Sequence, residues 1–131
     1  MDAASNRRDA RRVILPTQAT LSFQLGGQRL ENLSMANISH GGCLAMIPTT
    51  ISQGAVKEFL VRGAFLPDLR IHYPGIEAAP IVGRVAWSMG SDQETQAIGI
   101  QFVEMDSSTR ISIVATVDAA IIDQPEDNYR P

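Results

Sequence analysis

The sequence predicts a mainly-β protein: a small antiparallel β-barrel, preceded by a flexible N-terminal arm and followed by one C-terminal helix. Several short segments alternate apolar and polar residues with a period of two, which is typical of half-buried strands. Turn residues separate these segments at hairpin spacing, and the last apolar segment changes to a helical period. With 131 residues, 44% of them hydrophobic, the chain has the size and apolar content of one compact domain.

The first predicted hairpin joins two long strands. Apolar and polar residues alternate over residues 17–25, and Gly26 and Gly27 then supply a two-residue turn, because glycine tolerates positive φ. The second strand should run from about Gln28 to Ile38. Its apolar residues change parity near residues 34–36, so we expect a β-bulge there.

Further strands are predicted for five short segments: Cys43–Ile47, Val56–Val61, Leu69–Tyr73, Ile81–Ser88 and Ile98–Phe102. Residues 63–67 are ambiguous, because they show neither the alternation of a strand nor the spacing of a helix. Trp87 alternates in phase with Val85, so we expect it to be a core residue, with a role as a stacking platform for a ligand as the alternative.

The C-terminal segment predicts a helix that packs on or beside the barrel. Asp106, Ser107 or Ser108 can cap its start by accepting backbone N–H bonds. Its expected apolar stripe follows helical spacing, and two further residues widen it. The stripe comprises Ile111, Val114, Ala115, Asp118, Ile121 and Ile122, widened by Ile113 and Val117.

Three parts of the chain differ in composition. Residues 1–12 lack an apolar pattern and should form a flexible arm, residues 13–123 the barrel with its helix, and residues 124–131 a disordered tail.

Cys43 is the only cysteine, so no internal disulfide is possible, and we expect a small core residue. His72 has no second ligand at metal-binding spacing, so no metal site is expected.

Charge is distributed unevenly along the chain. The net charge is −3, yet the arm contains four arginines within six positions. An acidic body with 5% aromatic residues argues against a barrel that binds nucleic-acid polymers, whereas the arginine cluster suggests a small, local anion. No apolar run could span a membrane and none follows the arginines as in a secretory signal, so we expect a cytoplasmic protein.

Two motifs carry candidate binding chemistry. Arg8 and Arg12 form an R-x-x-x-R pattern in the arm, directly after Arg7. An N-x-S-x-x-G pattern, residues 37–42, follows at the end of the second predicted strand. A guanidinium group can donate two parallel hydrogen bonds to a phosphate or to the O6 and N7 atoms of guanine.

In this order, and within a barrel pattern, the motifs resemble those of the PilZ domain family, whose members bind the bacterial second messenger cyclic di-GMP. The resemblance continues through Gly83-Arg84-Val85-Ala86-Trp87 and Gly99-Ile100-Gln101-Phe102 and covers about residues 7–122, with 60–79 matching least well. It implies a six-stranded, split-barrel-like fold that needs no cofactor besides this ligand. The ligand-binding residues that it implies are Arg7, Arg8, Arg12, Asn37, Ser39, Gly41 and Gly42.

The resemblance further implies a non-enzymatic receptor that passes a signal to an unidentified protein partner as its arm becomes ordered. The alternative is a PilZ-like adaptor that works only through protein contacts and binds no nucleotide. An enzyme is disfavoured, because no carboxylate pair, metal-ligand set or nucleophile–base pair stands at readable spacing. His40, inside the second motif, is expected to be an exposed turn residue rather than a ligand contact.

Overall fold

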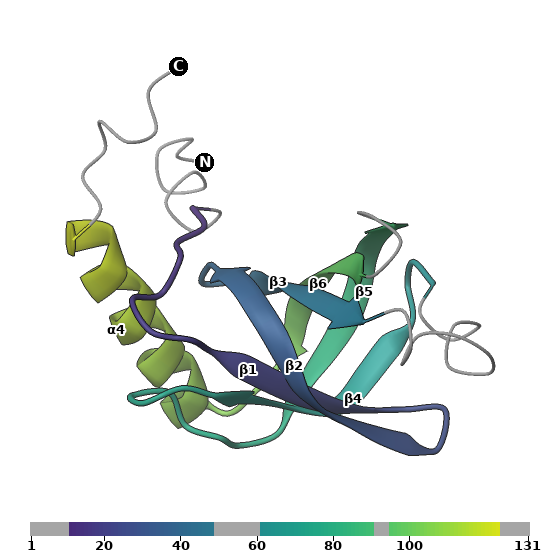
Figure 1. Ribbon diagram of the computed structural model, residues 1–131. Helices are drawn as coiled ribbons and strands as arrows, with labels where there is room; N and C mark the ends of the chain where they lie inside the picture. Colours follow the sequence, from purple (N-terminus) through teal and green to yellow (C-terminus); the bar gives the residue numbers. More distant parts are fainter. Residues whose placement is uncertain (1–10, 49–60, 91–94, 124–131) are drawn as a thin grey trace, which may run out of the picture.

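The computed structural model describes residues 11–48, 61–90 and 95–123. Within these residues, six antiparallel strands form a closed barrel in the order β1-β2-β3-β6-β5-β4, and one helix follows (Figure 1). The predicted six-stranded barrel with a C-terminal helix is therefore confirmed. The elements are β1 Thr20–Leu25, β2 Gln28–Ile38, β3 Gly42–Pro48, β4 Phe65–His72, β5 Ile81–Gly90, β6 Thr95–Glu104 and α4 Ser107–Asp123.

The turn between β1 and β2 has the backbone that its two glycines permit. Gly26 and Gly27 have φ angles of 57° and 80°. Positive φ at both central residues is characteristic of the type I′ turn, whose twist suits a β-hairpin. Beyond the turn, Leu25 pairs with Gln28, so the predicted hairpin is confirmed.

Two β-bulges decide which side chains face outward near the end of β2 and in β5. The β2–β3 register shifts between Met35 and Asn37, which confirms the bulge predicted near residues 34–36. The β5–β6 register shifts between Val85 and Trp87. Val85 is buried, whereas Trp87 is 39% exposed. The prediction of Trp87 as a core residue is therefore wrong, because the extra residue in β5 reverses the alternation.

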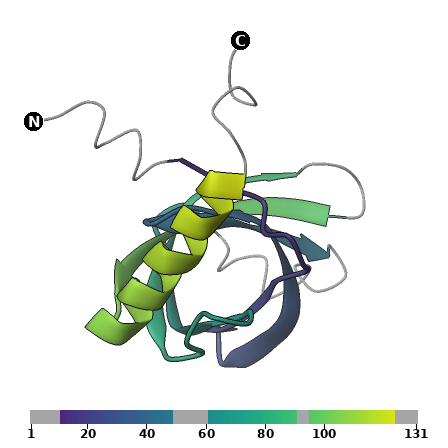
Figure 2. The same ribbon diagram turned by 90° about the vertical axis from the view of Figure 1, so that its left-hand side faces the viewer.

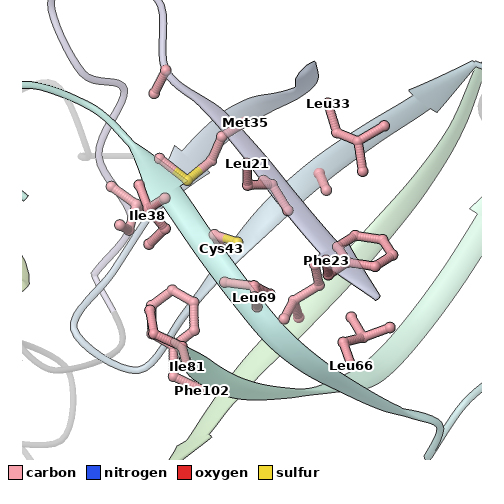
Figure 3. Packing of buried hydrophobic residues seen from close by; sticks show 14 of the residues in the cluster. Leu21, Phe23, Leu33, Met35, Ile38, Cys43, Leu66, Leu69, Ile81 and Phe102 are labelled. Atoms are coloured by element: carbon pink, nitrogen blue, oxygen red, sulfur yellow. The ribbon is translucent and has the colours of Figure 1, made fainter. Parts of the chain in front are cut away.

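A single apolar core fills the barrel and continues beneath α4. Figure 3 shows part of it, with Leu21 and Phe23 of β1 among side chains from the other strands. Figure 2 shows α4 lying across one end of the ring of strands, where Ile113 and Val117 join the same cluster. The helix thus covers apolar side chains that the open end of the barrel would leave in water.

The helix α4 begins where the sequence predicts, at Ser107. Its buried face agrees with the prediction only in part, because Ile113 and Val117 are buried as expected but two other residues of the predicted stripe are exposed. The Thr109 hydroxyl donates to Asp106 Oδ1 at 2.8 Å, and Arg110 N–H donates to the Asp106 carbonyl at 3.1 Å. Ile111 and Ile122, expected in the buried stripe, are 67% and 78% exposed. The buried residues are Thr109, Ile113, Val117 and Ala120. Apolar residues surround most of this helix, so their spacing alone did not single out one face.

Some predicted segments lie outside the described residues, namely most of the strand at Val56–Val61, residues 1–10 of the arm and the tail at 124–131. The ambiguous segment 63–67 leads into β4, which begins at Phe65. Among the described residues, the structure contains no helix long and apolar enough to cross a membrane.

Candidate functional site

The end of the arm is joined to the barrel beside the end of β2. Val13 N–H donates to the Ile38 carbonyl at 2.8 Å, and Ile38 N–H donates to the Val13 carbonyl at 3.0 Å. The Val13 side chain is buried in the core. This pair of hydrogen bonds places the preceding residue, Arg12, next to the N-x-S-x-x-G turn.

The two motifs meet in a direct side-chain contact. Arg12 Nη1 donates to Asn37 Oδ1 at 3.0 Å, across 25 residues of sequence. Arg12 is exposed at the surface, where a ligand could reach it. Arg7 and Arg8, the other candidate arginines, lie outside the described residues.

Ser39 holds the turn closed from within. Its N–H donates to the Gly42 carbonyl at 2.8 Å, and its hydroxyl donates to the same oxygen at 3.3 Å. On the far side of the turn, Phe102 N–H donates to the Gly41 carbonyl at 2.8 Å. The turn is therefore a braced loop whose backbone is fixed against β6.

The two glycines of the turn serve different purposes. A Cβ atom at Gly42 would overlap the carbonyl oxygen of Ile100, so this position requires the close approach of two backbones. A Cβ atom at Gly41 would have no neighbour within 4 Å. Gly41 thus leaves open space above the turn, where a ligand can approach the backbone.

The sequence predicts His40 to be an exposed turn residue, but in the structure its side chain does not point freely into water. Its Nε2 atom lies 2.8 Å from Asp118 Oδ1 of α4, and its side chain is only 14% exposed. The contact between a turn residue and a helix 78 positions later could not be read from spacing in the sequence.

An exposed aromatic ring lies on the same outer face of the barrel. Strand pairing forms a row in which Asn37 is opposite Leu44, Leu44 is opposite Gly99, and Gly99 is opposite Trp87. A Cβ atom at Gly99 would overlap the indole, so the ring lies over β6 at this glycine. From the sequence, Trp87 is predicted to be a core residue, with a stacking platform for a ligand only as the alternative. The glycine at the facing position is the signal that could have found it.

A second row of paired residues starts from the turn. Gly42 is opposite Gln101, which is opposite Arg84. Arg84 Nη2 donates to Gln101 Oε1 at 2.6 Å, and both side chains are exposed. With neighbouring strands about 4.8 Å apart, Arg84 lies within reach of a dinucleotide-sized ligand on this face.

Cys43 lies beneath the turn and offers no reactive group to it. Burial raises the pKa of the Cys43 thiol to about 12, while the nearby Arg12 guanidinium opposes that rise. The side chain is wholly buried, which confirms the predicted core position. The residue is therefore a neutral apolar group at physiological pH.

The opposite side of the barrel carries a separate polar network with a structural role. Asp68, whose φ of 53° is left-handed, accepts hydrogen bonds from Arg29 at 3.0 Å and from Arg70 at 2.9 Å. His72 lies 3.1 Å from the hydroxyl of buried Ser22. Across the described part of the chain, no group of three histidine, cysteine or acidic side chains could hold a metal ion.

Comparison with solved structures shows the same fold. The PilZ domain of YcgR from Escherichia coli, solved with c-di-GMP, superposes with a TM-score of 0.65 at 11% identity, covering 92% of this chain and 96% of that one. MrkH from K. pneumonia in its apo state gives a TM-score of 0.68 at 17% identity, covering 92% and 53%. This chain therefore spans about half the length of MrkH.

A third similar structure is the Borreliella burgdorferi PlzA protein in complex with c-di-GMP. Its TM-score is 0.63 at 10% identity, covering 97% of this chain and 56% of that one. No curated protein sequence matches. The model of the PilZ domain family matches residues 6–119, which include both motifs, the β5 and β6 patterns and most of the helix. This chain therefore belongs to the PilZ domain family.

Proposed function

We propose that this chain is a non-enzymatic receptor for cyclic di-GMP that signals to a protein partner through ordering of its N-terminal arm. The observation that carries the proposal is the 3.0 Å hydrogen bond between Arg12 and Asn37, which joins the two motifs at one surface. The described structures of YcgR and PlzA with c-di-GMP support the choice of ligand.

The chemistry of the ligand suits these side chains. Cyclic di-GMP has two phosphates, each with one negative charge, and two guanines. Arg12 and the proposed Arg8 would bind phosphate oxygens or the O6 and N7 edge of a guanine through paired N–H groups. The Asn37 amide can both donate and accept, which suits the remaining polar edge of a guanine.

The outer face beside the turn extends the proposed site. Trp87 offers an exposed indole face over β6, on which a base or a ribose could pack. Arg84 adds a guanidinium group in the adjacent row, held by Gln101. We infer that the ligand lies across β3 and β6, between the arm and Trp87.

Isothermal titration calorimetry with cyclic di-GMP tests the proposal. We expect the full chain to bind, and Arg12→Ala to bind at least about tenfold more weakly, because hydrogen bonds to charged groups contribute about 1.5–3 kcal/mol each. Arg12→Lys should not restore binding, since an ammonium group lacks the two-pronged geometry. Arg8→Ala should behave like Arg12→Ala.

Arg110→Ala provides the matched control, because it removes an exposed arginine at the start of α4, away from the turn. Its affinity should equal that of the wild type. Cyclic di-AMP tests base selection: the wild type should bind it far more weakly than cyclic di-GMP. If the wild type does not bind cyclic di-GMP, the receptor proposal is wrong and the protein-only adaptor takes its place.

A further inference from the structure

A polar contact between His40 and Asp118 connects the turn of the proposed site to the C-terminal helix. His40 Nε2 lies 2.8 Å from Asp118 Oδ1, with the imidazole 14% exposed and the carboxylate 46% exposed. His40 stands between Ser39 and Gly41, both of which make backbone hydrogen bonds that close and brace the turn. Asp118 therefore contacts the turn that follows Asn37 and that Ser39 holds closed from within.

Other contacts hold α4 on the barrel at points away from this turn. Ile113 and Val117 are buried in the common core. Ser112 Oγ accepts a hydrogen bond from Glu77 N–H at 3.1 Å, which fastens the helix to the segment before β5. Removing Asp118 would thus loosen the turn while leaving the apolar docking of the helix in place.

We propose that Asp118 is a positioning residue for the nucleotide turn, acting through His40, and that this contact couples ligand binding to the docking of α4. The inference rests on the proposed function. A turn already held in its binding geometry loses less conformational entropy when the ligand arrives, so the contact favours binding. Coupling between two sites is reciprocal, so the bound nucleotide stabilises the contact of α4 with the turn by the same factor.

The test compares Asp118→Ala with Asp118→Asn. Both variants lose the same negative charge, so their direct electrostatic effect on a dianionic ligand is equal, but only asparagine retains an oxygen that can accept from His40. By calorimetry, Asp118→Ala should bind cyclic di-GMP about fivefold more weakly than Asp118→Asn, which is at the low end of typical coupling between sites. In a His40→Ala background, the two substitutions should give equal affinities.

Ser112→Ala is the matched control, since it removes a contact of α4 that does not reach the turn. It should lower the midpoint of thermal unfolding without changing the affinity. If the wild type binds but Asp118→Ala and Asp118→Asn bind equally well, the positioning role is wrong and the proposed function stands.

Amide hydrogen exchange gives a readout that needs no ligand. In Asp118→Ala, the amides of residues 39–42 should exchange faster than in Asp118→Asn, because the turn has lost its outer support. Equal exchange in the two variants would overturn the inference even if the chain bound no nucleotide at all. Absence of binding by the wild type, in contrast, counts against the proposed function alone.

Discussion

Gly41 and Gly42 are neighbours in the turn, but they should differ sharply in their tolerance of a methyl group. Gly42→Ala places Cβ against the Ile100 carbonyl, so β3 and β6 must move apart, and we expect unfolding free energy to fall by about 1–3 kcal/mol. In Gly41→Ala the new methyl group meets open space, so the unfolding free energy should change by less than about 0.5 kcal/mol. Urea denaturation measures both, and equal losses would contradict the packing described for the turn.

The buried thiol of Cys43 predicts a distinct pH dependence of stability. Burial raises its pKa from 9.0 to about 12, so above pH 9 the unfolded chain releases this proton and the folded chain keeps it. The contribution of the neutral thiol to the unfolding free energy is complete below pH 9. It is lost between pH 9 and 12, at about 1.4 kcal/mol per pH unit. Between pH 8 and 10, the difference in unfolding free energy between wild type and Cys43→Ala should therefore shrink by about 1.4 kcal/mol. A constant difference would contradict the raised pKa.

At the scale of elements, α4 has two apolar faces of which the barrel buries one. Ile113→Ala removes a fully buried side chain and should cost about 2–5 kcal/mol of unfolding free energy. Ile111→Ala makes the same chemical change two residues earlier at an exposed position, and should cost less than about 0.5 kcal/mol. Chemical denaturation of both variants checks which face of α4 is buried. A larger loss of unfolding free energy in Ile111→Ala than in Ile113→Ala would show that the buried face is assigned wrongly.

Among the described residues, the sequence pattern located the strands better than it assigned their buried and exposed faces. Alternation of period two located β1, β2 and β6, and the conflict in parity near residues 34–36 revealed the bulge in β2. The bulge in β5 produced no such conflict, because Ala86 and Trp87 are both compatible with either face. The buried face of α4 was likewise undetermined, since only contact with the barrel selects it.

The candidate site could be predicted only in part for a similar reason. Motif spacing pointed to Arg12 and Asn37, and the fold brings them into contact. Trp87 and Asp118 reach the same region through strand register and helix docking, which are set by the whole fold rather than by local sequence. Local patterns therefore miss residues that other elements bring to the same surface.

At the scale of the whole molecule, the proposal is that nucleotide binding orders the arm across the barrel. Trypsin cleavage after Arg7 and Arg8 should then slow markedly when cyclic di-GMP is added, because the ligand supplies contacts that only the ordered arm can make. In Arg12→Ala the nucleotide should give little protection at the same concentration. Equal cleavage rates with and without nucleotide, at saturating occupancy, would place the conformational response elsewhere.

The most direct test of the central claim is a ¹H–¹⁵N NMR titration of the full chain with cyclic di-GMP. We expect the largest chemical-shift changes on the amides of residues 37–42 and on the indole N–H of Trp87, the single tryptophan of the chain. Signals from the network around Asp68, on the opposite side of the barrel, should change little. Absence of shifts at saturating nucleotide, or shifts centred on Asp68, would contradict the proposed site.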